Sequence, residues 1–225
     1  MTLSDYIWDV LDQAVTTVAE VTWIYERDVA KHELSSDLKL RVRTIVQDCQ
    51  SALDATATRV KNAYLTKSGR SPYYPFSIDA QKFNGKMEAE LRGLLAKEPD
   101  IAKAFERHQP YQPGKKELGY LKKLARVNKH QDFSPQYRKT TRQLHVPAGA
   151  RMTNDGKIIV IPDDLIINIH GPADMTISPV AEGATARILV GWNFINPDVD
   201  VLLTLIALTR LTREAVQDIR HVAAV

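Results

Sequence analysis

A single cysteine, Cys49, is present among the 225 residues of the chain. Because one thiol cannot form an intramolecular disulfide, a disulfide-stabilised scaffold and a paired-cysteine metal site are both excluded. Long apolar runs are also missing, since the longest, from Val201 to Leu211, is about half the length of a membrane-spanning helix. The first twelve residues carry acidic side chains where a secretory signal would have basic ones. We therefore expect a soluble, cytoplasmic protein.

The common motifs of catalysis and cofactor binding do not occur. The sequence has no Gly-rich phosphate loop, no His-Glu-x-x-His and no Gly-x-Ser-x-Gly, and its six histidines do not have the spacing of zinc ligands. From these absences we expect neither a metal nor a cofactor. Whether the protein is an enzyme is left open by the motifs.

Positive charge is concentrated in one part of the chain. Residues 101–150 contain 11 basic and 3 acidic side chains, a balance of +8, whereas the other residues carry 19 basic and 24 acidic side chains, a balance of −5. A basic segment of this kind can meet the phosphates of RNA or of a nucleotide. It is equally typical of a solvated helix face.

The first 130 residues have the periodicity of helices. Apolar side chains recur every three or four residues over about 4–30 and 37–66, which predicts two long helices joined by a short polar link as an antiparallel hairpin. Shorter helices are predicted over about 79–95, 100–105 and 115–130. The segments between them, 70–77 and 108–114, are rich in proline and aromatic residues, so we expect them to be ordered and packed against the bundle.

After Ser134 the period changes from about 3.6 to 2, which is the period of strands. Close turn signals separate short β-branched runs and favour an antiparallel meander, with predicted strands over 137–146, 157–161, 165–169, 175–178 and 186–194. A last helix is expected from about 198 to 222. The predicted fold class is thus α+β, with a helical bundle over 1–134 and a sheet plus C-terminal helix over 135–225, packed as one unit.

The candidate site with the most functional side chains lies at the end of the helix predicted over 115–130. It contains Arg126, Asn128, Lys129 and His130. Arg126 and His130 are four residues apart and therefore share a helix face, where the arginine could hold a phosphate while the histidine transfers a proton. The alternative is that basic groups in a last turn offset the helix dipole and bond its free carbonyls.

Four short motifs occur in a fixed order along the chain. They are QSALD at 50–54, YPF at 74–76, QPY at 109–111 and VNKHQ at 127–131. In this order they resemble a widespread family of uncharacterised bacterial proteins, which typically shows NLRSALD, then FPI, QPY and NxDKHR. The similarity covers about 45–132, and a late Trp192-x-Phe194 is also similar. The resemblance implies a shared architecture and assigns no reaction.

Departures from that family pattern remove charge. The first motif here begins Asp48-Cys49-Gln50 where Asn-x-Arg is usual, and the last has Arg126 for Asn, Asn128 for Asp and Gln131 for Arg. Such coordinated loss can preserve hydrogen bonds without ion pairing, and it argues against charge-dependent catalysis.

A helical hairpin followed by a helix that ends in Arg and His also resembles the HEPN group, bacterial helical bundles that include metal-independent RNases. The HEPN signature has a longer gap between its Arg and His than the three residues that separate Arg126 from His130. The resemblance is therefore one of fold and residue type.

Two hypotheses follow for the function. The favoured one is a non-catalytic interaction or binding module, with a homodimer built on the hairpin as one form, in which Asp54, Asn128 and Lys129 bind a ligand or partner. The alternative is a HEPN-like RNA endonuclease or toxin with Arg126 and His130 as catalytic residues. We predict that Asp54 lies within reach of the segment from Arg126 to His130; otherwise it lies on a solvated face of its helix.

Overall fold

The structure, a computed structural model, describes residues 3–31, 33–65, 69–130, 136–146, 151–154, 157–160, 165–169, 185–195 and 198–225. The chain forms two compact units, one of residues 1–136 with 194–225 and the other of residues 137–193. The first unit contains all the described helices, including the last one. The predicted α+β class, with a helical first part, is confirmed.

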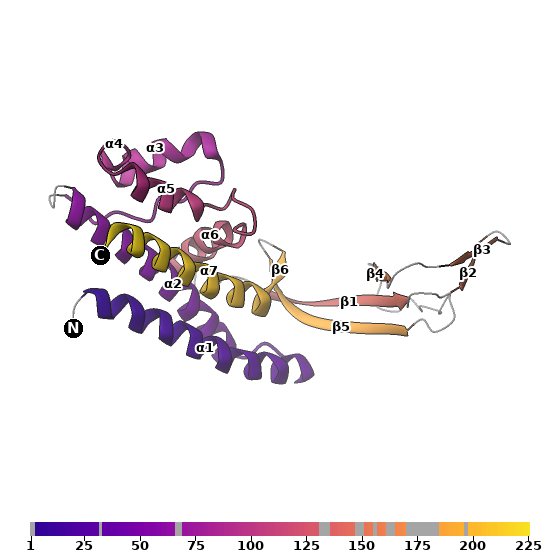
Figure 1. Cartoon of the computed structure of the whole chain (residues 1–225). Helices are drawn as coiled ribbons and strands as arrows, with labels where there is room; N and C mark the ends of the chain where they lie inside the picture. Colours follow the sequence, from indigo (N-terminus) through magenta and orange to yellow (C-terminus); the bar gives the residue numbers. More distant parts are fainter. Residues whose placement is uncertain are drawn as a thin grey trace. The chain divides into compact units, whose positions relative to one another are not determined.

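Two long helices, α1 (Leu3–Lys31) and α2 (Ser36–Tyr64), pack side by side as the predicted hairpin (Figure 1). The apolar stripes of the two helices face the core of the unit, and their largest fully buried members include Ile7, Leu11, Leu38 and Ile45. Burial of such stripes supplies most of the stability of a helix in a protein. The spacing in the sequence therefore predicted both the helices and their buried faces.

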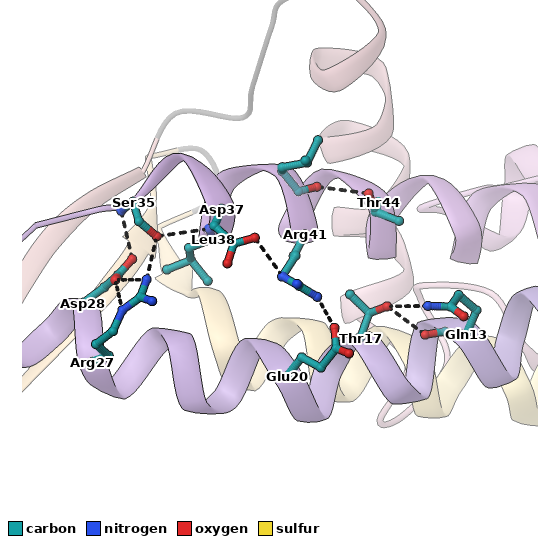
Figure 2. A network of polar contacts seen from close by, with 11 residues as sticks. Gln13, Thr17, Glu20, Arg27, Asp28, Ser35, Asp37, Leu38, Arg41 and Thr44 are labelled. Atoms are coloured by element: carbon teal, nitrogen blue, oxygen red, sulfur yellow. Dashed lines mark hydrogen bonds and ion pairs between the residues drawn. The ribbon is translucent and has the colours of Figure 1, made fainter.

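A buried carboxylate fixes the link between α1 and α2 (Figure 2). Asp28, only 2% exposed, accepts hydrogen bonds from the Ser35 backbone N–H at 2.8 Å and from Arg27 Nη2 at 2.8 Å. Ser35 in turn caps α2, since its Oγ accepts from the backbone N–H of Leu38 at 3.2 Å. Burial acts to raise the pKa of Asp28, but these hydrogen bonds outweigh burial and hold the pKa below its usual value.

Four shorter helices follow: α3 (Ala80–Glu90), α4 (Leu94–Lys97), α5 (Pro99–Arg107) and α6 (Glu117–His130). The prediction of a single helix over 79–95 is wrong, because the helix is interrupted between Leu91 and Gly93. Gly93 has a φ of +84°, a left-handed conformation that glycine adopts readily and that ends a helix. The other predicted starts are confirmed, with Asp79 capping α3 and Pro99 opening α5.

The segment between α2 and α3 packs into the bundle as predicted. Tyr74 and Phe76 are 3% and 5% exposed, and their ring centroids are 4.7 Å apart. The Tyr74 ring also contacts Phe105 of α5, with centroids 5.5 Å apart. Tyr73, expected to add buried area, is instead 52% exposed. Tyr73 thus lies at the edge of the buried part of the segment, which runs from Tyr74 to Ser77.

The described residues of the second unit form strands. Among the described residues of the chain, the strands are β1 (Gln136–Val146), β2 (Arg151–Asn154), β3 (Lys157–Val160), β4 (Leu165–Ile169), β5 (Thr185–Phe194) and, in the first unit, β6 (Val199–Asp200). Strand β1 lies between β4 and β5, whereas β2 and β3 form a separate antiparallel pair. β1 and β4 pair antiparallel, from Arg142 opposite Ile169 to Val146 opposite Leu165. The order therefore differs from a sequential meander, and the strand predicted over 175–178 lies outside the described residues.

The last helix, α7 (Val201–Ala223), returns to the bundle and packs against α1, α2, α5 and α6 (Figure 1). Asp200 caps it, because its Oδ1 accepts from the Leu203 N–H at 2.8 Å while its Oδ2 accepts from the Tyr25 hydroxyl at 2.7 Å. The inner face of α7 buries Leu205, Leu208 and Leu211. Among the described helices, none combines the length and the apolar composition that crossing a membrane requires.

Candidate functional site

A cavity of about 670 Å³ opens in the helical unit between α2, α3, α6 and the segment that joins α2 to α3. Its lining differs from element to element: polar and acidic side chains come from α2, aromatic rings from the joining segment, and basic groups from α3 and α6, with the acid Glu90 also on α3. The lining residues are Gln47, Asp48, Gln50, Ser51, Asp54, Tyr73, Tyr74, Pro75, Phe76, Lys86, Glu90, Lys122, Ala125 and Arg126.

Asp54 connects the α2 wall to the aromatic wall. Its Oδ1 accepts a hydrogen bond from the Tyr74 backbone N–H at 2.7 Å and another from Gln50 Nε2 at 2.8 Å. Burial raises the pKa of Asp54, the two hydrogen bonds oppose the rise, and the nearby Glu90 adds to it. Asp54 Oδ2 makes no hydrogen bond to the described residues, so one acceptor of this half-buried carboxylate is available to a ligand.

Three basic side chains line the opposite side of the cavity. Lys86 comes from α3, and Lys122 and Arg126 come from α6. Burial lowers the pKa of Lys122, as do the positive charges of Lys86 and Arg126, whereas Glu90 acts to raise it. Within the part of the chain that the structure describes, none of the three basic groups forms a hydrogen bond or an ion pair. The cavity thus holds three cations that form no ion pair with the described residues, although three carboxylates, Asp48, Asp54 and Glu90, line it as well.

The two other acids of the cavity differ in their hydrogen bonds. The Glu90 carboxylate accepts hydrogen bonds from Arg70 Nη2 at 3.2 Å and from the Tyr73 backbone N–H at 3.0 Å. Asp48 makes no such bond to the described residues, and burial raises its pKa. Perturbed pKa values gathered around one cavity are typical of functional sites, since burial and neighbouring charges are what a binding site arranges.

Of the residues that the sequence singled out, Asp54 and Arg126 line this one cavity. Asp54 does not lie on a solvated face, because it supports the chain at Tyr74. The backbone of Asn128, Lys129 and His130 forms the last turn of α6, whereas their side chains lie outside the described part of the structure. Arg126 and His130 are on one helical face, as their spacing predicted.

Sequence reasoning missed Lys86 and Lys122 as site residues. Lys122 precedes Arg126 by four positions, so the two were predictable neighbours on one helical face. Lys86 is on another helix, and no local pattern indicates that α3 brings it to the same cavity.

A second cluster of charged groups joins α5 to α7. His108 Nε2 lies 2.9 Å from Asp218 Oδ2, and Arg107 donates to the same carboxylate at 3.0 and 3.1 Å. Lys115 pairs with Glu214 at 2.6 Å. Burial lowers the pKa of His108 although the Asp218 carboxylate acts to raise it. The charges of this cluster compensate one another, so it is a structural clamp in which His108 has a hydrogen-bonding role.

The coupling of Asp54 to the end of α6 can be measured. Replacing Asp54 with Asn removes a negative charge, and we expect the pKa of His130 to fall because its charged form loses that support. Titration of the His130 ring by NMR measures this shift. Asp37→Asn removes the same charge at the first turn of α2 and should leave the His130 pKa unchanged. An unmoved pKa in Asp54→Asn would show that the two residues are uncoupled.

Comparison with known proteins gives no match, whether with protein-family models, with curated proteins or with solved structures. The residues of the cavity and their geometry are therefore the basis for a functional assignment.

Proposed function

We propose that this protein is a non-catalytic binding module and that the cavity between α2, α3 and α6 holds a small anionic ligand. The observation that carries the proposal is the cluster of Lys86, Lys122 and Arg126, three cations without partners among the described residues on one side of the cavity. Like charges held close together repel, and a bound anion would relieve the repulsion.

The size and the lining of the cavity support the same proposal. A volume of about 670 Å³ falls within the range of small-molecule sites. The described residues that line it include neither a histidine nor a cysteine. Its buried carboxylate, Asp54, is already engaged in holding the chain at Tyr74. These features favour binding over acid–base or nucleophilic catalysis.

The proposal is tested by titrating isotope-labelled protein with inorganic pyrophosphate and following the backbone amides by NMR. We expect shifts at Tyr74 and around Lys122, which weaken as salt is added. Lys122→Gln should weaken binding about fivefold, since a solvent-exposed charge contributes at most about 1 kcal/mol. Lys123→Gln is the matched control, because it removes the same charge from a neighbouring exposed residue that does not line the cavity. The absence of any shift at millimolar pyrophosphate would contradict the proposal.

A second candidate function is metal-independent cleavage of RNA, favoured by the place of Arg126 in the cation cluster on the helix that ends at His130. In such a reaction the ribose 2′-hydroxyl attacks the adjacent phosphorus and the 5′-oxygen leaves. Arg126 would stabilise the negative charge that develops on the phosphate, and His130 would transfer the proton.

Incubation with structured and unstructured RNA in EDTA separates the two functions. The binding proposal predicts no cleavage above that of a His130→Ala variant purified in parallel. Cleavage by the natural protein that His130→Ala loses would assign the nuclease function instead.

A further inference from the structure

We propose, on the basis of the binding function above, that the ligand of the cavity between α2, α3 and α6 is a nucleoside monophosphate. Its phosphate would lie against Lys122 and Arg126, and its base would stack on Tyr73 within reach of Asp54 Oδ2. Three features of the cavity lead to this assignment: its bipolar charge, its exposed aromatic ring and its unused acceptor.

The charges of the cavity are unevenly distributed over the elements that line it. The three cations come from α3 and α6, whereas Asp48 and Asp54, neither of which forms an ion pair with the described residues, come from α2. The third acid, Glu90, ends α3 and is already bound by Arg70 and by the Tyr73 N–H. A ligand that fits both sides needs an anionic end and a neutral, donor-bearing end. A nucleoside monophosphate has this polarity, while the added phosphates of a di- or triphosphate would approach the acids of α2.

Tyr73 supplies a flat surface for a base. The residue lines the cavity, 52% of its surface is exposed, and its backbone N–H is fixed by Glu90 at 3.0 Å. The Arg70 guanidinium carbon lies over the Tyr73 ring, 5.6 Å from its centroid, so a base would stack on the opposite face. An exposed tyrosine with a fixed backbone and a cation on one face is a common platform for nucleobases.

Asp54 supplies the polar contact beside that platform. Its Oδ1 is used by Tyr74 and Gln50, and its Oδ2 has no partner among the described residues. A ring N–H or an exocyclic amine of a base can donate to this oxygen. Bases offer such donors next to a stacking face, whereas simple anions such as citrate offer neither.

Calorimetric titration with adenosine 5′-monophosphate tests the assignment, beside inorganic phosphate, adenosine and glutamate as separate probes. We expect the monophosphate to bind at least tenfold more tightly than any of the three, because it alone contacts both walls. Tyr73→Ala should weaken monophosphate binding roughly five- to hundredfold, the range measured for loss of base stacking, and leave phosphate binding unchanged. Tyr73→Phe keeps the stacking ring and should retain the affinity.

The outcomes separate this inference from the binding function on which it rests. If phosphate or pyrophosphate binds but the nucleotide binds no more tightly, the nucleotide assignment is overturned and the anion-binding function stands. Tighter binding of glutamate would likewise replace the nucleotide with an amino acid. If none of these probes binds, both proposals fall together.

Discussion

Truncation of Phe76 to alanine is expected to lower the free energy of unfolding by about 3–5 kcal/mol. The side chain is 5% exposed, and its ring lies against Tyr74 with centroids 4.7 Å apart. Because Tyr74 also contacts Phe105 of α5, the three rings form one aromatic cluster between the joining segment and the bundle. Removing a buried ring from a packed cluster leaves a cavity that the surrounding helices cannot fill.

Chemical denaturation followed by circular dichroism measures this loss. Ile78→Ala is the control, because Ile78 is two residues away and 78% exposed, so its truncation should change stability by no more than about half a kcal/mol. Phe76→Leu keeps much of the apolar volume and should lie between the two. A loss for Phe76→Ala as small as that for Ile78→Ala would show that the aromatic cluster does not stabilise the fold.

The sequence predicted only part of what the segment between α2 and α3 shows. Two prolines and three aromatics predicted order but did not distinguish buried rings from exposed ones. A simple period of two does not account for the burial, because Pro75 and Ser77 are buried as well as Tyr74 and Phe76. The Phe76 N–H donates to the Tyr74 carbonyl at 2.8 Å, so the chain turns here, and local sequence did not predict which rings are buried.

Local sequence patterns did not predict which strands pair with one another. The runs that became β1 and β4 were predicted as strands, yet their pairing from Arg142 opposite Ile169 skips the β2–β3 pair that lies between them in sequence. Local periodicity gives the faces of a strand but not its partner. Prediction of the basic cluster in the cavity has the same limit. The spacing of Lys122 and Arg126 makes them neighbours on one helix, whereas only the tertiary fold brings Lys86 of α3 to the same cavity.

The motifs that suggested a bacterial family meet one another in the structure. Asp54 of QSALD accepts from the backbone N–H of Tyr74 in YPF at 2.7 Å. Gln109 of QPY accepts from the N–H of Ser77, just after YPF, at 2.7 Å. These motifs therefore hold the segment between α2 and α3 in place, and in doing so they shape the aromatic wall of the cavity. Their polar residues have a structural role that spacing alone did not reveal.

Gln109→Ala is expected to lower the free energy of unfolding by about 1–3 kcal/mol. The Gln109 side chain is fully buried, and its Oε1 accepts from the Ser77 N–H at 2.7 Å while its Nε2 donates to the Phe105 carbonyl at 2.9 Å. Truncation leaves the Ser77 N–H without a partner and removes one of the two donors to the Phe105 carbonyl, which keeps the His108 N–H at 3.3 Å. A buried unsatisfied group costs about 1–3 kcal/mol. Gln112→Ala, in the same turn but partly exposed, should cost much less.

The Gln109→Glu variant tests the same bridge through pH. A protonated glutamate can donate to the Phe105 carbonyl and accept from Ser77, as glutamine does, whereas an ionised one cannot donate and places a charge in the core. Burial should therefore raise the folded-state pKa of the new carboxyl above its unfolded value of about 4.3. The variant should then approach natural stability at acid pH and lose stability as pH rises through the raised pKa. Denaturation of both proteins between pH 4 and pH 8 measures the difference, and parallel stability curves would show that Gln109 does not bridge the two segments.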